Sequence, residues 1–328
     1  MILVTGATGR VGGLLVRRLR RAGQEVRALV RKGSAYYWLN DTACRFSFGD
    51  LRDPDSLSRA LDGVHTLYVA SGPRLEERHN HHANVTEAGH AALFSRAVAR
   101  GVQRVVLLSC VGVERVAGVR AFAARLAAEH ALAATGPSFA ILRAGLHEHQ
   151  ALDLLDRAAA GLAPGGGEAP INPLCASDIA AAAVALGQSD REGVVELGGA
   201  EAMTGAELLR RAAAAAGISA PRGLPLALAR ALARAGRPVR RYAHRLAEDI
   251  AWLHAPMAAD GILTARSLGL SLRSFDEALA EAVAERRAMA DPAERERRMV
   301  HPQFYATVYQ PGEAPLASLP SGPPPRRT

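Results

Sequence analysis

Three glycines near the N-terminus have a spacing that could hold phosphate groups. Residues 4–12, VTGATGRVG, follow an aliphatic run that favours a strand and lead into a helical pattern. In that context the first glycine permits a tight turn, the second lets backbone approach a pyrophosphate, and the third allows a helix to pack closely on the strand. Free N–H groups and the positive end of the helix dipole would then face the phosphates. The candidate contacts are Gly6, Thr8, Gly9, Arg10, Val11 and Gly12.

Two cations, Arg31 and Lys32, stand at the tip of the second predicted strand, about 20 residues after the glycine motif. A site for NAD places a carboxylate at this tip, where it accepts hydrogen bonds from the ribose hydroxyls. Here the tip carries no acid, and two cations suit a 2′-phosphate. The motif and the tip together favour NADP over NAD, with a solvated helix entry as the alternative interpretation of the two cations.

The elements that must position these residues alternate regularly over the first 145 residues. Glycines 23, 63, 101 and 136 each close a helical pattern just before the next strand, as C′ glycines do. Such alternation predicts βαβ units and an α/β fold with a doubly wound, Rossmann-type parallel sheet. The predicted strands are 1–5, 25–30, 66–70, 104–109 and 139–143, and the predicted helices are 12–22, 54–61, 86–99 and 121–134.

After Gly145 the pattern becomes looser, with a helix over 151–160, a Gly/Pro turn at 164–167, a strand over 194–197 and a charged helix over 276–299. We therefore expect a dinucleotide-binding domain over 1–150 and a smaller mixed region for substrate or docking over 151–300. Residues 301–328, rich in Pro and Gly towards their end, should form an extended or mobile tail.

The overall composition is that of an ordinary globular protein: 328 residues, 49% hydrophobic and 22% charged. The net charge of +8 favours anionic partners. The cysteines Cys44, Cys110 and Cys175 are far apart and lack CxxC spacing, which argues against a disulfide framework or a zinc site. A strand at the first residue and the lack of a long apolar stretch predict a cytoplasmic protein, at most peripheral at the inner face of a membrane.

Several motifs make the chain resemble the atypical short-chain dehydrogenase/reductase superfamily, in particular its NmrA-like branch. They are the opening TGATGxxG, Gly49-Asp50-Leu51 after the third strand, Ala70-Ser71-Gly72 after the fourth, and Ala140-Ile141-Leu142-Arg143. The resemblance implies that Asp50 and Leu51 border the adenine, and that Ala70, Ser71 and Gly72 run along the cofactor. Within the branch the layout is most similar to photosystem II assembly factors and to the dinucleotide-binding accessory subunit of respiratory complex I.

The superfamily's catalytic signature is incomplete in this chain. A Tyr protonates the substrate carbonyl there, a Lys four residues later lowers the pKa of that Tyr, and a Ser ends the preceding strand. Ser109 matches the serine, and alignment on Glu129 places Arg125 at the lysine and Ala121 at the tyrosine. Arg125 can hold a ribose or phosphate, but alanine cannot transfer a proton. The resemblance therefore predicts a dinucleotide site without ordinary Tyr-dependent carbonyl reduction.

Two histidine groups provide alternative chemistry. The first group comprises His79, His81 and His82, with His90 further on, and it has three possible interpretations: a metal site, a proton donor or substrate contact, and a solvated polar loop. The second, His147 and His149, follows the strand that ends at Arg143, and one of the two could act as the acid in place of the missing tyrosine. A polar loop entry is the alternative, and we assign no metal site.

A basic amphipathic stretch over 222–245 carries seven arginines among leucines. Such a stretch can dock on an acidic protein complex or lie on an anionic membrane surface, or it can be a plain solvated face. We do not expect binding to nucleic acid, because no recognised nucleic-acid-binding motif and no interleaved aromatic residues accompany the charge.

These observations leave three functional hypotheses open. The first is an NADP-binding protein with a structural, assembly or redox-sensing role in a larger complex. The second is an NADPH-dependent reductase of a quinone, a flavin or a small carbonyl compound. The third, an NADP-sensing transcriptional co-regulator, follows from the NmrA resemblance alone.

Overall fold

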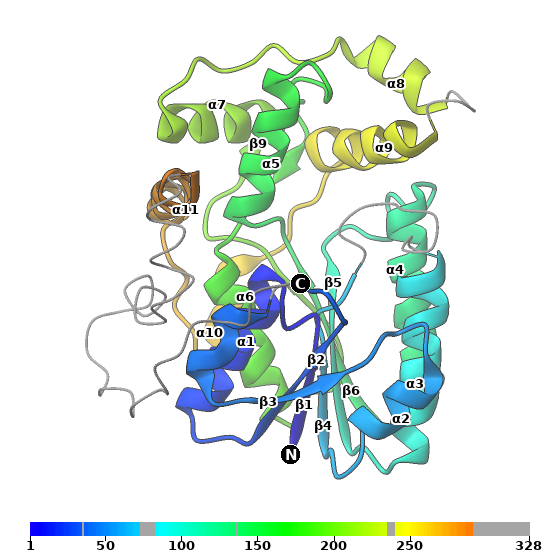
Figure 1. Ribbon diagram of the computed structural model, residues 1–328. Coiled ribbons are helices and arrows are strands. Elements are labelled where there is room, and N and C mark those ends of the chain that lie inside the picture. The colour runs from blue at the N-terminus through cyan, green and yellow to red at the C-terminus, as the bar shows by residue number, and fades with distance from the viewer. Residues whose placement is uncertain (35, 73–82, 136, 235–239, 291–328) are drawn as a thin grey trace, which may run out of the picture.

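A seven-stranded parallel sheet forms the centre of the computed structural model, which describes residues 1–34, 36–72, 83–135, 137–234 and 240–290 (Figure 1). The strand order is β3-β2-β1-β4-β5-β6-β8, and every neighbouring pair is parallel. The chain reverses its direction of progress between β1 and β4, which is where doubly wound sheets open a crevice for ligands. The strands are β1 (Ile2–Thr5), β2 (Val26–Val30), β3 (Arg45–Phe48), β4 (Thr66–Val69), β5 (Arg104–Cys110), β6 (Ser138–Ala144) and β8 (Gly193–Leu197).

Helices cover both faces of this sheet, as Figure 1 shows. One face packs against α1 (Arg10–Arg21), α6 (Ala176–Gly187) and α10 (Gly261–Ser267) through a core of aliphatic residues and alanine. The other face packs against α2 (Pro54–Ala60), α3 (His90–Ala99) and α4 (Arg120–Ala133). The central strands β1 and β4 are buried along their whole length, as strands covered by helices on two sides must be.

A second group of elements lies beyond the carboxyl edge of the sheet and forms a cap over it (Figure 1). A separate apolar cluster holds much of this cap together and includes Trp252, Phe275 and Leu279. A short antiparallel pair of strands joins its helices. The cap elements are α5 (Glu148–Ala159), β7 (Pro170–Ile171), β9 (Met203–Thr204), α7 (Gly205–Ala216), α8 (Leu226–Arg234), α9 (Arg240–His254) and α11 (Phe275–Ala290).

The predicted α/β fold and its order of elements are confirmed. Gly23, Gly63 and Gly101 have the positive φ angles expected of C′ glycines, at 74°, 68° and 70°. Gly136 lies outside the described residues, as do residues 301–328 and the end of the helix predicted over 276–299. The boundary near residue 150 stays a prediction, although β8, from beyond it, pairs with β6 inside the main sheet.

The segment before α3 differs from the prediction. The sequence predicts a helix over 86–99, but the chain forms a π-helical segment, η2 (Ala83–Gly89), before α3 begins. Gly89 permits close packing there, because a Cβ at this position would lie 3.0 Å from both the Asn84 oxygen and the Leu51 Cβ. A 3-10 segment, η1 (Tyr37–Thr42), similarly joins β2 to β3.

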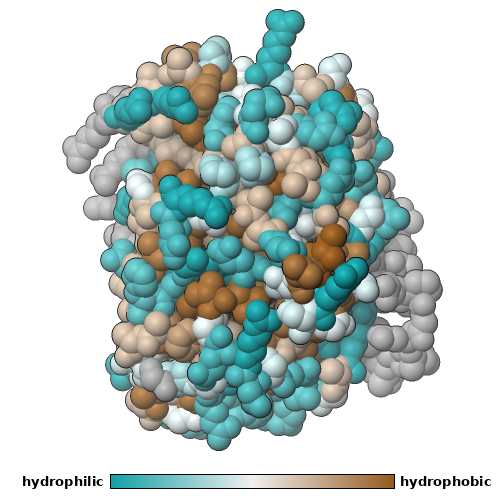
Figure 2. Space-filling view, turned by 180° about the vertical axis from the view of Figure 1, so that it is seen from behind, coloured by the Kyte–Doolittle hydropathy of each residue, from teal (hydrophilic) through white to brown (hydrophobic). Residues whose placement is uncertain are grey.

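The surface of the described residues offers few large apolar groups. Figure 2 shows apolar residues on the rear face as separate patches between hydrophilic ones. The most exposed large apolar side chains, Leu263 at 65% and Leu162 at 49%, come from different parts of the chain. Scattered exposed residues of this kind are normal for a folded domain. No described helix is both long and apolar enough to cross a bilayer, and the three cysteines are buried and free.

Candidate functional site

The glycine loop connects β1 to α1 and is shaped by close backbone contacts. Gly6 has a φ of 67°, and a Cβ there would lie 2.4 Å from the Ala70 carbonyl oxygen at the end of β4. A Cβ at Gly12 would lie 2.2 Å from the Gly6 carbonyl oxygen. The tight turn expected at the first glycine and the close packing expected at the third are therefore both present. A Cβ at Gly9 would meet only the Gly6 oxygen, at 3.2 Å, and no described side chain caps this first turn of α1.

Charged residues gather at the ends of β2 and β3. Arg31 and Lys32 are exposed directly after β2, as predicted from the sequence. Asp50, after β3, accepts hydrogen bonds from the Arg52 guanidinium at 2.8 and 2.6 Å. These bonds hold the pKa of the Asp50 carboxyl below its usual range, and the charge of Arg31 acts in the same direction. Sequence reasoning missed Arg52, whose only signal was its position two residues after Asp50.

Leu51, which the family resemblance placed beside the adenine, is buried in the core between the sheet and α2. Only 7% of its surface is exposed. Its side chain therefore packs in the core, whereas the side chains of Asp50 and Arg52 remain accessible to solvent at this edge.

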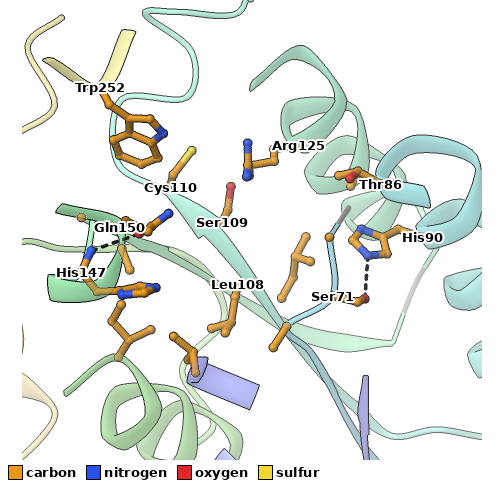
Figure 3. Close-up of a pocket in the computed structure, with 18 residues that line it drawn as sticks. Ser71, Thr86, His90, Leu108, Ser109, Cys110, Arg125, His147, Gln150 and Trp252 are labelled. Carbon is orange, nitrogen blue, oxygen red and sulfur yellow. Dashed lines mark hydrogen bonds between the residues drawn. The ribbon is translucent and has the colours of Figure 1, made fainter. Parts of the chain in front are cut away.

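A cavity of about 180 Å³ lies at the carboxyl ends of β4, β5 and β6, between the sheet and the cap (Figure 3). It brings together eight residues that the sequence singled out and adds others from η2, α5 and α9. Apolar side chains such as Leu108 and Ile179 form part of its wall. The predicted residues in its lining are Val11, Ala70, Ser71, Gly72, His90, Ser109, Arg125 and His147, and the additional polar or aromatic ones are Thr86, Cys110, Gln150 and Trp252.

The Ser109 hydroxyl donates a short hydrogen bond to Glu129 of α4. Glu129 is 3% exposed, and Arg143 of β6 donates to both of its carboxylate oxygens, with the shortest of these bonds at 2.6 Å. Arg143 also bonds Glu114 at 2.7 Å and Glu196 at 3.4 Å. A buried ion pair of this kind is tolerated because each charge is paired and hydrogen-bonded. The network fixes the Ser109 hydroxyl at the cavity wall.

The two positions of the missing catalytic pair lie in different surroundings. Ala121 is 1% exposed and belongs to the apolar cluster of the cap. Arg125, one turn further along α4, lines the cavity, donates to the Ala121 carbonyl oxygen at 3.2 Å and lies over the Phe122 ring at 5.6 Å. The position that would carry the phenol is thus a packed methyl group, while the position of the ammonium still offers a cation.

At the end of β4, which is the neighbour of β5 in the sheet, three polar side chains form a chain of hydrogen bonds. The Ser71 hydroxyl lies 3.0 Å from Nε2 of His90 and 2.8 Å from the Thr5 hydroxyl. His90 begins α3 and is 2% exposed, and Figure 3 shows it beside Ser71 at the cavity. The fourth-strand segment is therefore held in place from both β1 and α3. The rest of the predicted histidine cluster, His79 to His82, lies outside the described residues.

The two histidines after β6 separate from each other. His147 lines the cavity at the start of α5, where burial lowers its pKa to about 3. His149 does not line the cavity; its Nδ1 lies 3.3 Å from the Arg10 guanidinium, which in turn bonds Glu285 of α11 at 2.7 Å. His147 is therefore the one that faces the cavity, whereas His149 belongs to a contact between the glycine loop and α11. Among the described residues no group of three or more His, Cys, Asp or Glu side chains is arranged to hold a metal ion.

Comparison with known proteins agrees with this geometry. A model of a family described as NAD(P)H-binding matches residues 6–189. Sterol demethylase protein B of Methylococcus capsulatus is 39% identical over 117 residues, 34% of each chain. Photosystem II assembly factor Ycf39 of Cyanophora paradoxa is 29% identical over 161 residues, 48% of this chain and 50% of that one. These alignments thus span no more than half of either relative.

Among solved structures, the NADPH-dependent quinone oxidoreductase of Escherichia coli in complex with NADPH superposes with a TM-score of 0.69. The alignment covers 88% of this chain and 100% of that one at 23% identity. A likeness at this identity shows the fold. The resemblance to atypical dehydrogenase/reductase proteins that the motifs predicted is confirmed by the family match and by the assembly-factor relatives.

Proposed function

Because this chain belongs to the NAD(P)H-binding family, we propose that its dinucleotide lies across the carboxyl edge of the sheet, from the ends of β2 and β3 to the cavity. Gly9 leaves room for the pyrophosphate at the N-terminus of α1, where backbone N–H groups and the helix dipole favour anions. The nicotinamide end then occupies the cavity beside β5 and β6. The residues proposed to hold the dinucleotide are Gly6, Thr8, Gly9, Arg10, Val11, Gly12, Arg31, Lys32, Asp50, Ala70, Ser71, Gly72, Ser109 and Arg125.

The dinucleotide we propose is NADP(H) in preference to NAD(H). Arg31 and Lys32 are exposed at the tip of β2, where a 2′-phosphate would meet them. The nearby carboxylate, Asp50, is neutralised by two hydrogen bonds from Arg52 and so repels a phosphate less than a free acid would. Three cations around one paired acid favour an extra phosphate.

The role we propose is structural or redox-sensing, within a larger assembly, and one observation carries it. Ala121, at the position of the family's catalytic tyrosine, is packed in the core at 1% exposure. When bound, a reduced nicotinamide supplies a hydride, but reduction of a simple carbonyl also needs an acid at the oxygen. Neither Ala121 nor Ser109, whose proton is directed to Glu129, provides that acid.

A second candidate, an NADPH-dependent reductase, is favoured by the cavity itself. Its wall includes Trp252 and Ile179, which suit an apolar acceptor, and His147 from the cap. A quinone or flavin spreads the negative charge left by hydride transfer over its ring, so it depends less on an acid than a ketone does. In this second case His147 would assist as a neutral hydrogen-bond donor, because its pKa of about 3 leaves it uncharged at neutral pH.

The cap supplies the surface for docking that we propose. Arg222, Arg230 and Arg234 are exposed on and before α8, which lies at the outer end of the cap in Figure 1. Leu228 of the same helix is 47% exposed. Cations beside an exposed leucine fit an acidic protein or an anionic lipid surface. We accordingly propose that residues 1–150 hold the dinucleotide and that the region 151–300 makes the contact with a partner.

Turnover separates the two candidates. NADPH is mixed with the full-length protein and a panel of quinones, flavins and small carbonyl compounds, and the absorbance of the reduced nicotinamide is followed. The structural or sensing role predicts bound NADPH that no acceptor oxidises. Sustained oxidation that falls when His147 is replaced by Gln, with His130→Gln at an exposed histidine of α4 as the matched control, would instead establish the reductase.

A further inference from the structure

The hydrogen-bonding capacity of Ser109 is restricted by its buried partner. Glu129 carries two hydrogen-bonded oxygens under the Arg143 guanidinium, and a carboxylate can only accept. The Ser109 hydroxyl therefore donates its one hydrogen bond to Glu129. Only the lone pairs of the Ser109 oxygen remain for a ligand, so this hydroxyl acts as a hydrogen-bond acceptor towards the cavity.

The same wall of the cavity carries a donor. Arg125 has five N–H groups, and the described contacts of its guanidinium are one bond to the Ala121 carbonyl and the face of Phe122. Both Ser109 and Arg125 line the cavity, and Figure 3 shows their polar ends in it, one from β5 and one from α4. The wall thus pairs an acceptor with a donor.

We propose that this pair binds a primary carboxamide, namely that of the nicotinamide ring, with Ser109 accepting from the amide N–H and Arg125 donating to the amide oxygen. The inference rests on the proposed function, since it assumes that the nicotinamide end of the dinucleotide reaches this cavity. A primary amide offers one donor group and one acceptor, and the wall offers an acceptor at Ser109 and a donor at Arg125.

This assignment gives Ser109 a role other than that of the family's serine. A hydroxyl that donates to a substrate carbonyl needs a free proton, and Glu129 holds that proton here. A hydroxyl that donates to a carboxylate also becomes a better acceptor, because hydrogen bonds in a chain polarise one another. Ser109 would therefore orient the ring and contribute nothing to protonation, and Glu129 and Arg143 would act through it as positioning residues.

Dinucleotide analogues test the assignment directly. NADP and its 3-acetylpyridine analogue differ only in that a methyl group replaces the amide NH₂, so the analogue keeps the carbonyl for Arg125 and loses the N–H for Ser109. We expect calorimetric titration to show that the wild-type chain binds the analogue about 5- to 10-fold more weakly than NADP, the range for one lost hydrogen bond. Ser109→Ala should bind both with nearly equal affinity.

Further variants and a second analogue make the comparison specific. Ser109→Thr keeps a hydroxyl and should restore the preference for NADP. Ser58→Ala, which removes a hydroxyl of α2 outside the cavity lining, should leave the preference unchanged. Thionicotinamide NADP keeps the NH₂ group, so its affinity relative to NADP should be the same in the wild type and in Ser109→Ala.

Equal affinities of the wild type for NADP and the acetylpyridine analogue, or a preference that persists in Ser109→Ala, would overturn the assignment while leaving dinucleotide binding intact. Failure of the wild type to bind NADP at all would overturn the proposed function, and this inference with it.

Discussion

Replacing Arg31 by Asp should weaken NADP binding far more than NAD binding. Arg31 is exposed at the tip of β2, and its charge is felt by Asp50 across the end of β3. A charge-assisted hydrogen bond contributes about 1.5 to 3 kcal/mol, and exposure to water and salt puts Arg31 near the lower end of that range. Loss of the bond alone therefore predicts about a 10-fold weaker complex.

The new carboxylate adds to this effect on NADP. Its repulsion of a 2′-phosphate contributes a comparable penalty, so the combined loss should approach about 100-fold, limited by the cations that remain at Lys32 and Arg52. NAD, which has no 2′-phosphate, should bind Arg31→Asp as well as the wild type or better, because the Asp can accept from its ribose hydroxyls.

Calorimetric titration of both dinucleotides at low and high salt measures these differences. High salt should reduce the preference of the wild type for NADP, because the contacts are exposed. Arg45→Asp is the matched control: it makes the same change at an exposed residue at the start of β3, where Arg45 pairs with Glu25. If Arg31→Asp weakens NAD and NADP equally, the assignment of the 2′-phosphate to the tip of β2 is refuted.

Three further predictions concern stability and the glycine loop. Gly12→Ala should abolish dinucleotide binding and lower the melting temperature, because its Cβ would lie 2.2 Å from the Gly6 carbonyl oxygen; titration and calorimetry check both, and unchanged binding would contradict the loop geometry. Arg143→Met should destabilise the protein by about 3 to 5 kcal/mol in denaturant unfolding, since it leaves Glu129 buried without its ion-pair partner. Adding Glu129→Gln should recover part of that loss, and a loss under about 1 kcal/mol would contradict a stabilising role for the pair. Burial lowers the folded-state pKa of His147 to about 3, below the value near 6.5 of an unfolded chain, so protonation favours unfolding. The free energy of unfolding should therefore fall as the pH decreases from about 6.5 towards 3. His147→Gln should make this dependence on pH less steep, and an unchanged dependence would exclude His147 as its source.

The parts of the fold that follow from local pattern were predictable. Alternating apolar runs and C′ glycines such as Gly23 and Gly101 are encoded within a few residues, and they are sufficient to give the order of strands and helices around the sheet. The spacing from Glu129 likewise placed Ala121 and Arg125 on one helix, and the structure puts the first in the core and the second at the cavity.

Contacts between distant segments could not be read in the same way. Trp252 reaches the cavity from the cap, more than a hundred residues after β5, and no local pattern marks it. Arg143 gathers carboxylates from three different segments, although the sequence shows only that it ends a strand. The sequence groups His149 with His147, but the two side chains leave the start of α5 in different directions, and His149 contacts Arg10 instead of lining the cavity. Such contacts between distant segments depend on tertiary packing and have no local signature in the sequence.

Calorimetric titration of the purified full-length chain with NADPH and with NADH measures whether this chain binds a dinucleotide and which one it prefers. We expect NADPH to bind at one site per chain and more tightly than NADH, because the glycine loop accepts a pyrophosphate and the cations after β2 and β3 accept an additional phosphate. Binding of neither dinucleotide, or tighter binding of NADH, would contradict it.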